Sequence, residues 1–140
     1  MTLVIAETQD IATCLQLRRV VFIEEQGVTE ADEVDGLDEG ARHLLALWDG
    51  RPIGTARLMV AGDTGKIGRV CVLPQQRGRG VGAALIRAGV TAIRAVPGVL
   101  VVTLGAQVHA LGFYQGLGFV AVGEDYQDAG IAHRDMVLTL

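Results

Sequence analysis

The stretch Gln76-Arg77-Gly78-Arg79-Gly80-Val81-Gly82 lies between an apolar segment typical of a strand and an apolar segment with helical spacing. Its three alternating glycines have no Cβ, so the backbone can turn tightly and direct successive N–H groups to one side. The following helix adds unpaired N–H groups and the positive end of its dipole. Arg77 and Arg79 supply positive charge, and no Ser, Thr, Asp or Asn stands at the natural cap position. The stretch therefore predicts a site for an anion such as phosphate.

The spacing of this glycine-rich loop does not fit the common nucleotide-binding motifs. A P-loop would need GxxxxGK followed by Ser or Thr, which the chain lacks. A dinucleotide fold would need GxGxxG in an early βαβ unit. Here the spacing is GxGxG and hairpin signals come before it, so both motifs fail. A purely structural connection stays open at this point, because 19 of the 140 residues are glycine.

Outward from the loop, the apolar spacing predicts one α+β domain. A first helix is expected from Asp10, its cap, to Gly27, and the acidic stretch Val28–Gly40 has room for one more helical turn at most. Asp49-Gly50 marks a hairpin. Later helices are expected over Val81–Val96 and Gln107–Gly116. Strands are expected over Leu3–Ala6, His43–Trp48, Ile53–Val60, Lys66–Leu73, Val99–Leu104, Phe119–Gly123 and Ala132–Leu140.

The apolar run Val99–Leu104 has no polar alternation, which predicts a central strand that is buried on both faces. The segment Gly62–Gly65 is expected to form the turn before Lys66–Leu73. No internal repeat and no linker interrupts the pattern. We therefore expect residues 1–140 to form a single domain of about seven strands and three or four helices.

Composition excludes several classes of protein. Half of the residues are hydrophobic and 20% are charged, which is typical of a folded chain. No apolar run approaches the ~20 residues that span a bilayer, and no signal peptide is apparent, so we expect a cytoplasmic protein without a membrane partner. The net charge of −4 argues against nucleic-acid binding. Cys14 and Cys71 fit no metal or redox spacing and are expected to be reduced thiols.

The charges are distributed unevenly along the chain. Four arginines follow one another at Arg69, Arg77, Arg79 and Arg87, whereas Glu24–Glu39 is strongly acidic. The arginines indicate an anionic ligand. The acidic stretch suggests a cationic ligand nearby, although charged loops are often only solvated.

Two ordered motifs resemble those of one family. Arg69-Val70-Cys71-Val72-Leu73-Pro74 and the loop after it resemble the central motif of the GNAT acetyltransferases, in which a strand, Arg/Gln-x-x-Gly-x-Gly/Ala and a helix follow one another. Phe113-Tyr114-Gln115-Gly116-Leu117-Gly118-Phe119 resembles the family's FYxxxGF segment. A finer similarity is to the ElaA/YjcF-like acetyltransferases. Its marks are VFIEEQG from Val21, AQVHA from Ala106 and DAGIAH from Asp128.

The resemblance implies a GNAT fold with a mixed, mostly antiparallel sheet, and direct attack of an amine on the thioester of acetyl-CoA. It places the pantetheine arm of the cofactor beside Val70, Cys71 and Val72, which would bind it mainly through their main chain. The pyrophosphate would meet the N–H groups of Arg77, Gly78, Arg79, Gly80, Val81 and Gly82. Phe113 would pack against the arm. Cys71 is then expected to be a buried apolar residue of its strand and not a nucleophile.

Tyr114 corresponds to the tyrosine that gives a proton to the departing CoA thiolate in the family. A phenol is protonated at neutral pH and can act as a general acid. Its alternative role is that of a core aromatic residue. The family commonly has Asn near the start of the helix that carries the tyrosine; here the corresponding position is Gln107, whose longer side chain could still bind the pantetheine amide.

The general base and the acceptor stay open in the sequence. Glu25, His109 and an ordered water are candidates for the base, while His43 and His133 fall on or near expected strands. The expected function is an acetyl-CoA-dependent N-acetyltransferase acting on a primary amine of a small molecule or peptide. The alternatives are a non-catalytic module that binds or senses acyl-CoA, and a nucleotide-binding protein. No metal is expected, and a homodimer is possible.

Overall fold

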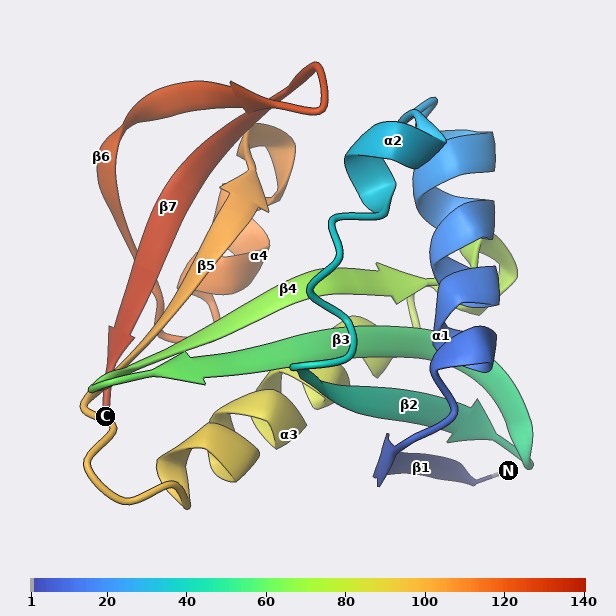
Figure 1. Ribbon diagram of the computed structural model, residues 1–140, viewed down its shortest axis with the longest axis horizontal. Helices are drawn as coiled ribbons and strands as arrows, with labels where there is room; N and C mark the ends of the chain where they lie inside the picture. Colours follow the sequence, from blue (N-terminus) through green and yellow to red (C-terminus); the bar gives the residue numbers. More distant parts are fainter. Residues whose placement is uncertain (1) are drawn as a thin grey trace.

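The computed structural model describes residues 2–140, which form a seven-stranded sheet in the order β1-β2-β3-β4-β5-β7-β6 (Figure 1). All neighbouring strands are antiparallel except β4 and β5. The strands are β1 (Leu3–Thr8), β2 (Arg42–Trp48), β3 (Arg51–Ala61), β4 (Thr64–Val72), β5 (Val101–Gln107), β6 (Val120–Asp128) and β7 (Ile131–Thr139). The α-helices are α1 (Ile11–Arg18), α2 (Glu30–Glu33), α3 (Val81–Arg94) and α4 (Leu111–Gln115). The expected α+β class and strand number are confirmed.

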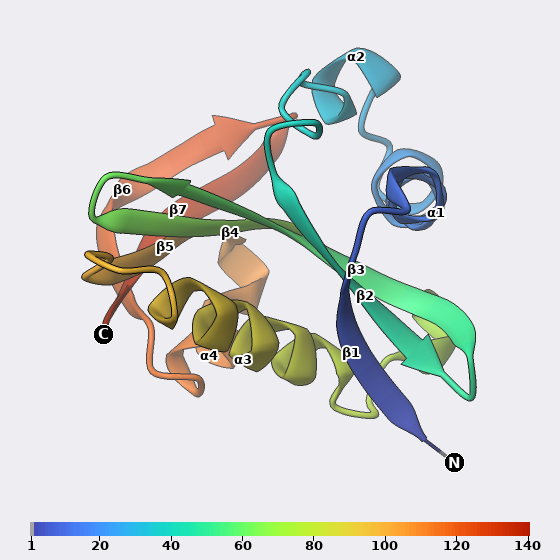
Figure 2. The same ribbon diagram turned by 60° about the horizontal axis from the view of Figure 1, so that its bottom comes forward.

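Two hydrophobic cores cover opposite faces of this sheet. On one face, Leu85, Ile86 and Ile93 of α3 pack into a large cluster with buried side chains of β2 to β5. On the other face, Cys14 and Leu17 of α1 pack in a smaller cluster with residues of β2 and β4. Figure 2 shows α3 and α4 below the sheet and α1 and α2 above it. The sheet therefore separates an α3 face from an α1 face.

The pairing between β4 and β5 is short. It extends from Thr64↔Val101 to Lys66↔Thr103, and the two strands then diverge (Figure 1). Beyond Lys66, no strand within residues 2–140 pairs with the edge of β4 that faces β5. Because backbone N–H and C=O groups need hydrogen-bond partners, this wedge in the middle of the sheet is suited to binding an extended, amide-containing ligand.

The first helix begins as expected and changes character halfway. The Asp10 carboxylate accepts a hydrogen bond from the Thr13 N–H at 3.2 Å and caps α1. From Arg19 to Glu25 the chain continues as a π-helix, and it ends at Gly27, which has φ +75°. A π-helical segment is rare and often lies at a functional site. Periodicity alone predicted one uninterrupted α-helix here.

Four expectations about element boundaries were wrong. The strand expected over Phe119–Gly123 is Val120–Asp128 and so ends five residues later. The turn before β4 contains only Gly62 and Asp63, since β4 begins at Thr64. The strand expected over Val99–Leu104 is Val101–Gln107, and it is buried on one face only: Val102, Leu104 and Ala106 face the α3 core. The other face of β5 lines a cavity. The helix expected to begin at Gln107 begins at Leu111, after a 3₁₀ turn over Val108–Ala110, because Gln107 is the last residue of β5.

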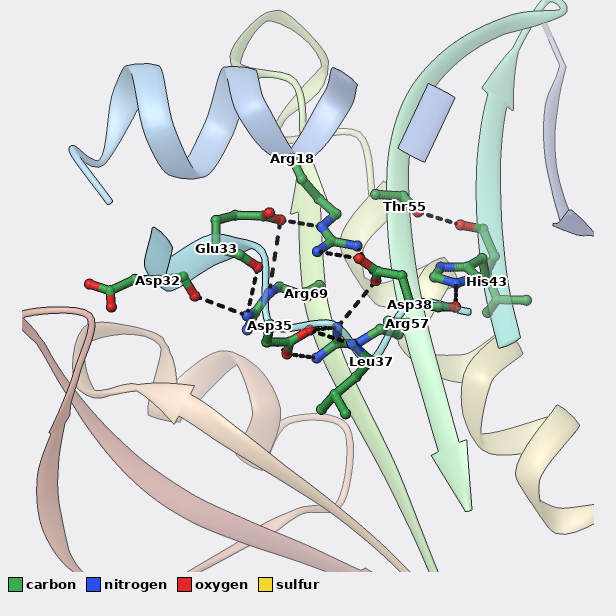
Figure 3. Close-up of polar contacts among 11 residues, drawn as sticks. Arg18, Asp32, Glu33, Asp35, Leu37, Asp38, His43, Thr55, Arg57 and Arg69 are labelled. Atoms are coloured by element: carbon green, nitrogen blue, oxygen red, sulfur yellow. Dashed lines mark hydrogen bonds and ion pairs between the residues drawn. The ribbon is translucent and has the colours of Figure 1, made fainter. Parts of the chain in front are cut away.

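The acidic stretch after the first helix is neutralised by buried arginines from other elements (Figure 3). Arg18, which is 1% exposed, donates to Glu33 and, at 2.7 Å, to Asp38. Arg57, which is 4% exposed, donates to both carboxylate oxygens of Asp35 at 2.8 and 2.7 Å. Arg69 adds a contact to Asp35 at 3.3 Å. We call these six residues, Arg18, Glu33, Asp35, Asp38, Arg57 and Arg69, the buried ion cluster.

The buried ion cluster changes the meaning of the acidic stretch. Its three carboxylates are occupied by three arginines, so they do not present free negative charge to a ligand. Glu30 of the same stretch is paired with Arg19. The suggestion that Glu24–Glu39 attracts a cationic ligand is therefore not supported by these residues. Instead, the charges attach α2 and the loop after it to α1, β3 and β4.

The buried ion cluster predicts a loss of stability in acid. Hydrogen bonds from Arg57 lower the pKa of Asp35. At Asp38, burial raises the pKa, but the hydrogen bonds and charges of Arg18 and Arg57 together outweigh burial, so the pKa of Asp38 is lowered as well. A carboxylate whose pKa is lower in the folded protein than its unfolded value of ~3.9 stabilises the fold above that pH. This stabilisation is lost as the pH falls toward the folded-state pKa. The free energy of unfolding, measured in urea, is expected to fall steeply below about pH 4. Asp35→Asn should lower stability at neutral pH and flatten this dependence; an equally steep fall in the variant would contradict the role of Asp35.

Candidate functional site

A cavity of about 660 Å³ opens where β4 and β5 diverge. It is bounded by the glycine-rich loop at one end and by the β6–β7 hairpin and α2 at the other. Figures 1 and 2 both place the β6–β7 turn beside α2, above the wedge. Of the residues expected to form the site, those lining the cavity are Val70, Cys71, Val72, Arg77, Gly78, Gly80, Val81, Gly82, Gln107, Phe113 and Tyr114. Arg79 is the one expected site residue outside this lining.

The glycine-rich loop presents a bare helix end to the cavity. Gly78 and Gly80 both have φ +79°, a conformation that residues with a side chain rarely adopt. Gly80 is the N-cap of α3, and no side chain of the described residues caps this helix. The first N–H groups of α3 are consequently left without a side-chain acceptor at this end of the helix.

The two arginines of the loop are held by protein groups. The Nη1 and Nη2 atoms of Arg77 each donate to a carboxylate oxygen of Glu25 at 2.6 Å, and its Nε donates to the Val72 carbonyl at 3.1 Å. Arg79 donates to Gln76 at 3.0 Å, and its guanidinium lies 5.1 Å from the centroid of the Trp48 ring. Both side chains therefore fasten the loop to its surroundings, Arg77 to the end of the π-helix and Arg79 to β2.

The pairing with Arg77 makes Glu25 a poor candidate for a general base. The hydrogen bonds from the Arg77 guanidinium lower the pKa of the Glu25 carboxyl. A carboxylate that is stabilised in its charged form binds a proton less readily. Glu25 is also absent from the cavity lining.

A bulge in β4 lies beyond Lys66, in the part of the strand that borders the wedge. Thr55 pairs with Cys71 and Arg57 pairs with Gly68, so β4 has one residue more than β3 between these pairs. Arg69, within the bulge, has φ +50°. Such a bulge rotates the backbone locally and redirects its polar groups.

Cys71 is buried on β4, and its environment disfavours the thiolate. It is 4% exposed, and burial raises the pKa of the thiol to about 12. Relative to an unfolded thiol with a pKa of ~8.5, the thiolate population falls by roughly 10³-fold. The burial agrees with the expectation that Cys71 is a buried residue of its strand.

Alkylation provides a test of this burial. In the native protein at about pH 8, Cys71 and the fully buried Cys14 are expected to react with iodoacetamide at least ~10²-fold more slowly than in urea. Mass spectrometry of timed samples measures both rates at each residue. Rapid modification of Cys71 in the folded protein would show that its thiol is accessible and reactive.

Tyr114 and Phe113 lie side by side on α4, and both line the cavity. Their rings meet edge to face with centroids 5.0 Å apart, and Tyr114 also packs at 6.3 Å against Phe119, which is 2% exposed. Phe113 is 45% exposed, and a Cβ built on Gly82 would lie 3.5 Å from its ring. Burial raises the pKa of the Tyr114 phenol, so its hydroxyl keeps its proton at neutral pH. The cavity thus combines the uncapped N-terminus of α3, the unpaired edge of β4 and a protonated phenol.

Residues 19–140 match the family model described as "Acetyltransferase (GNAT) domain". This chain belongs to the GNAT acetyltransferase family. It is 32% identical to the uncharacterised N-acetyltransferase YjcF of Bacillus subtilis over 98% of this chain and 99% of the relative. It is 36% identical to protein ElaA of Escherichia coli over 87% of this chain and 82% of the relative. These similarities support its place in the ElaA/YjcF-like subgroup.

Solved structures confirm the GNAT fold. An acyl-CoA N-acyltransferase from Pseudomonas aeruginosa superimposes with a TM-score of 0.87 at 32% identity, covering 98% of this chain and 99% of the other. The crystal structure of Escherichia coli ElaA superimposes with a TM-score of 0.83 at 30% identity, with the same coverage. The GNAT acyl-CoA N-acyltransferase fold implies the use of acyl-CoA.

Two of the sequence segments that resemble the ElaA/YjcF-like subgroup, VFIEEQG and AQVHA, are joined by a hydrogen bond inside the cavity of this GNAT protein. The Gln107 side chain donates to the Gln26 side chain at 3.0 Å and lies 2.7 Å from Nε2 of His109. Gln26 was not among the expected site residues, although it belongs to the VFIEEQG segment. Its bond to Gln107 connects the end of the first helix with the end of β5.

The third mark, DAGIAH, forms the turn between β6 and β7 and the start of β7. Asp128, Ile131 and His133 of this segment line the cavity, as does Tyr126 of β6. Tyr126 was not among the residues expected at the site. The spacing alone gave no signal for it, because β6 is exposed along most of its length and contains a bulge between Val122 and Tyr126.

The described part of the chain lacks two features, a metal-binding cluster and a membrane-spanning helix. Among residues 2–140, no group of three or more His, Cys, Asp or Glu side chains could hold a metal ion. Of the helices in the same range, none is long and apolar enough to cross a membrane.

Proposed function

We propose that residues 1–140 form one N-acetyltransferase domain, which transfers the acetyl group of acetyl-CoA directly to a primary amine of a small molecule or peptide. The observation that carries this proposal is the cavity between β4 and β5. The bare N-terminus of α3 and Tyr114 both open into it, and the unpaired edge of β4 connects them. Membership of the GNAT family supports the same chemistry.

The residues present fit the parts of acetyl-CoA in order. The pyrophosphate would accept hydrogen bonds from the N–H groups of Arg77–Gly82, where no side chain caps the helix. The amides of the pantetheine arm would pair with the main chain of Val70–Val72. Phe113, which is partly exposed beside Gly82, would pack against the arm, and Gln107 would bind one of its amides. Acetyl-CoA supplies an activated acyl group as a thioester.

The protein's own contribution to the reaction is to position groups and move protons. Tyr114 would give its phenolic proton to the sulfur as the C–S bond breaks, which avoids the release of a free thiolate. The raised pKa of Tyr114 keeps this proton in place until it is needed. The buried ion cluster would hold α2 and its loop as a fixed wall on the acceptor side, since Glu33, Arg57 and Arg69 line the cavity there.

Binding and turnover test the proposal in two steps. Thermal unfolding should shift upward with CoA and acetyl-CoA, and less or not at all with ATP or NAD. Incubation with acetyl-CoA and a panel of primary amines, with detection of the released thiol, should then identify an acceptor. Comparison of acetyl-CoA with longer acyl-CoA thioesters establishes the acyl preference. Tight CoA binding without turnover on any amine would favour a non-catalytic acyl-CoA module instead.

A further inference from the structure

The three histidines of the chain differ in how their rings are bound. The Nε2 atom of His43 lies 2.8 Å from the Asp38 carbonyl, and this residue is 3% exposed and outside the cavity. The Nε2 atom of His109 lies 2.7 Å from the Gln107 side-chain oxygen. In His133 it is Nδ1 that is bound, at 2.7 Å from the Ile131 carbonyl. His133 lines the cavity, and no hydrogen bond within residues 2–140 reaches its Nε2.

The bond to Ile131 determines the tautomer of His133. A carbonyl oxygen only accepts hydrogen bonds, so Nδ1 must carry the proton. In the neutral ring the lone pair then lies on Nε2. A histidine whose Nδ1 is fixed by a carbonyl and whose Nε2 is unoccupied has the arrangement of a proton acceptor.

The strand register places His133 on the acceptor side of the sheet. It pairs directly with Gln107, the last residue of β5, so both side chains lie on the same face. The neighbouring residue of β5, Ala106, is buried in the α3 core, and alternation puts Gln107 and His133 on the opposite, α1 face. The buried ion cluster lies on this α1 face as well. His133 therefore lies in the cavity lining on the same face of the sheet as the buried ion cluster.

The ring of His133 is supported from the neighbouring strand. The Tyr126 ring stacks on it with centroids 6.0 Å apart and an interplanar angle of 23°. The Tyr126 hydroxyl is itself fixed, because it donates to Asp135 at 2.6 Å. A Cβ on Gly105 would lie 2.6 Å from this hydroxyl, so glycine at that position leaves the space in which Tyr126 lies. His133 is thus held at Nδ1 and across its face.

We propose that Nε2 of His133 is the general base that deprotonates the acceptor amine; this rests on the proposed function. Nε2 takes one proton from the ammonium group, and the neutral nitrogen forms the N–C bond with the thioester carbon. The C–S bond breaks with its electron pair on sulfur, which takes the Tyr114 proton. After the N–C bond has formed, the attacking nitrogen loses a second proton, which reprotonates Tyr114. The proton that His133 took from the ammonium group passes to solvent. The acceptor class is therefore a primary amine that is protonated at neutral pH.

A pH comparison of His133→Gln with the wild type tests this role. The acceptor is the best amine from the wild-type panel, and the readout is kcat/KM at about pH 7 and about pH 9. The variant is expected to lose about 10²-fold at the lower pH and less than ~10-fold at the higher pH, where more of the amine is neutral without a base. The other titratable or charged groups that line the cavity are Asp32, Glu33, Arg57, Lys66, Arg69, Cys71, Arg77, His109, Tyr114, Tyr126 and Asp128, and Asp135 is bound to Tyr126. They are present in both proteins, so the ratio of variant to wild type isolates His133.

His109→Gln is the matched comparison, because it makes the same substitution at the other histidine of the cavity. Its effect is expected to be smaller and equal at the two pH values. If His133→Gln lowers kcat/KM by the same large factor at both pH values, the proposal is overturned and His133 has a structural role. Wild-type protein that turns over no amine would instead refute the proposed function, so the two failures are distinguishable.

The tautomer can be measured without any substrate. In ¹⁵N spectra of the free protein at about pH 8, His133 should show a protonated Nδ1 and an unprotonated Nε2, identified by signals missing in His133→Gln. A ring protonated at Nε2 would overturn the proposal, whatever the activity.

Discussion

Tyr114→Phe is expected to lower kcat by ~10²–10⁴-fold with little change in the affinity for acetyl-CoA. The substitution removes only the hydroxyl, and the ring keeps its edge-to-face contacts with Phe113 and Phe119. Without the phenol, the thiolate must leave unprotonated or take a proton from water. Steady-state kinetics with the identified amine and calorimetric binding of CoA measure the two effects separately.

The pH profile adds a second signature of Tyr114. A general acid acts only while it is protonated, so wild-type activity should fall as pH rises through the pKa of the phenol, which burial has raised above its usual value. The variant should lack this fall. If kcat changes less than threefold while circular dichroism and thermal unfolding match the wild type, Tyr114 has no part in proton transfer.

The second large effect is expected for stability, from Arg18→Leu. Arg18 is 1% exposed and contacts the carboxylates of Glu33, which is 3% exposed, and Asp38. Its removal would leave a buried carboxylate without its partner. Such a loss costs about 3–5 kcal/mol, a large share of the stability of a small domain. Urea unfolding at pH 7 measures the change.

The neighbouring residue provides the control for Arg18. Arg19 directly follows it and is paired with Glu30, but their side chains are 52% and 67% exposed. Arg19→Leu is therefore expected to cost less than about 1 kcal/mol. The double variant Arg18→Leu/Glu33→Leu should recover part of the loss, since it removes both buried charges. Equal effects of Arg18→Leu and Arg19→Leu would show that burial of the ion pair contributes little.

Much of the fold could be predicted because its signals are local. The Asp49-Gly50 turn has φ values of +49° and +80°, and it joins β2 and β3 as the hairpin pattern required. The glycine-rich loop and the helical spacing after it located α3 to within two residues. The order of the two motifs was enough to predict the family, and the cavity brings nearly all of the expected residues together.

The remaining features depend on contacts between distant parts of the chain. Nothing near Glu33, Asp35 and Asp38 in sequence shows that Arg57 and Arg69, well separated along the chain, neutralise them. The same holds for the pairing of Arg77 with Glu25, which are 52 residues apart. The start of β5 was misplaced because Val99 and Leu100, which precede it, are as apolar as the strand itself. Sequence alone also could not rank the histidines, since the free nitrogen of His133 depends on a carbonyl two residues away.

The wedge between β4 and β5 has a consequence for how this protein can diversify. If the cofactor is bound mainly by main-chain groups, its recognition is largely independent of the side chains around it. Side chains on the acceptor wall can then be exchanged without loss of the acyl donor. A library randomised at Met59, Lys66 and Asp128, which line the cavity away from the glycine-rich loop, should retain CoA binding in most members while its amine preference changes. One scaffold could in this way serve many acceptors.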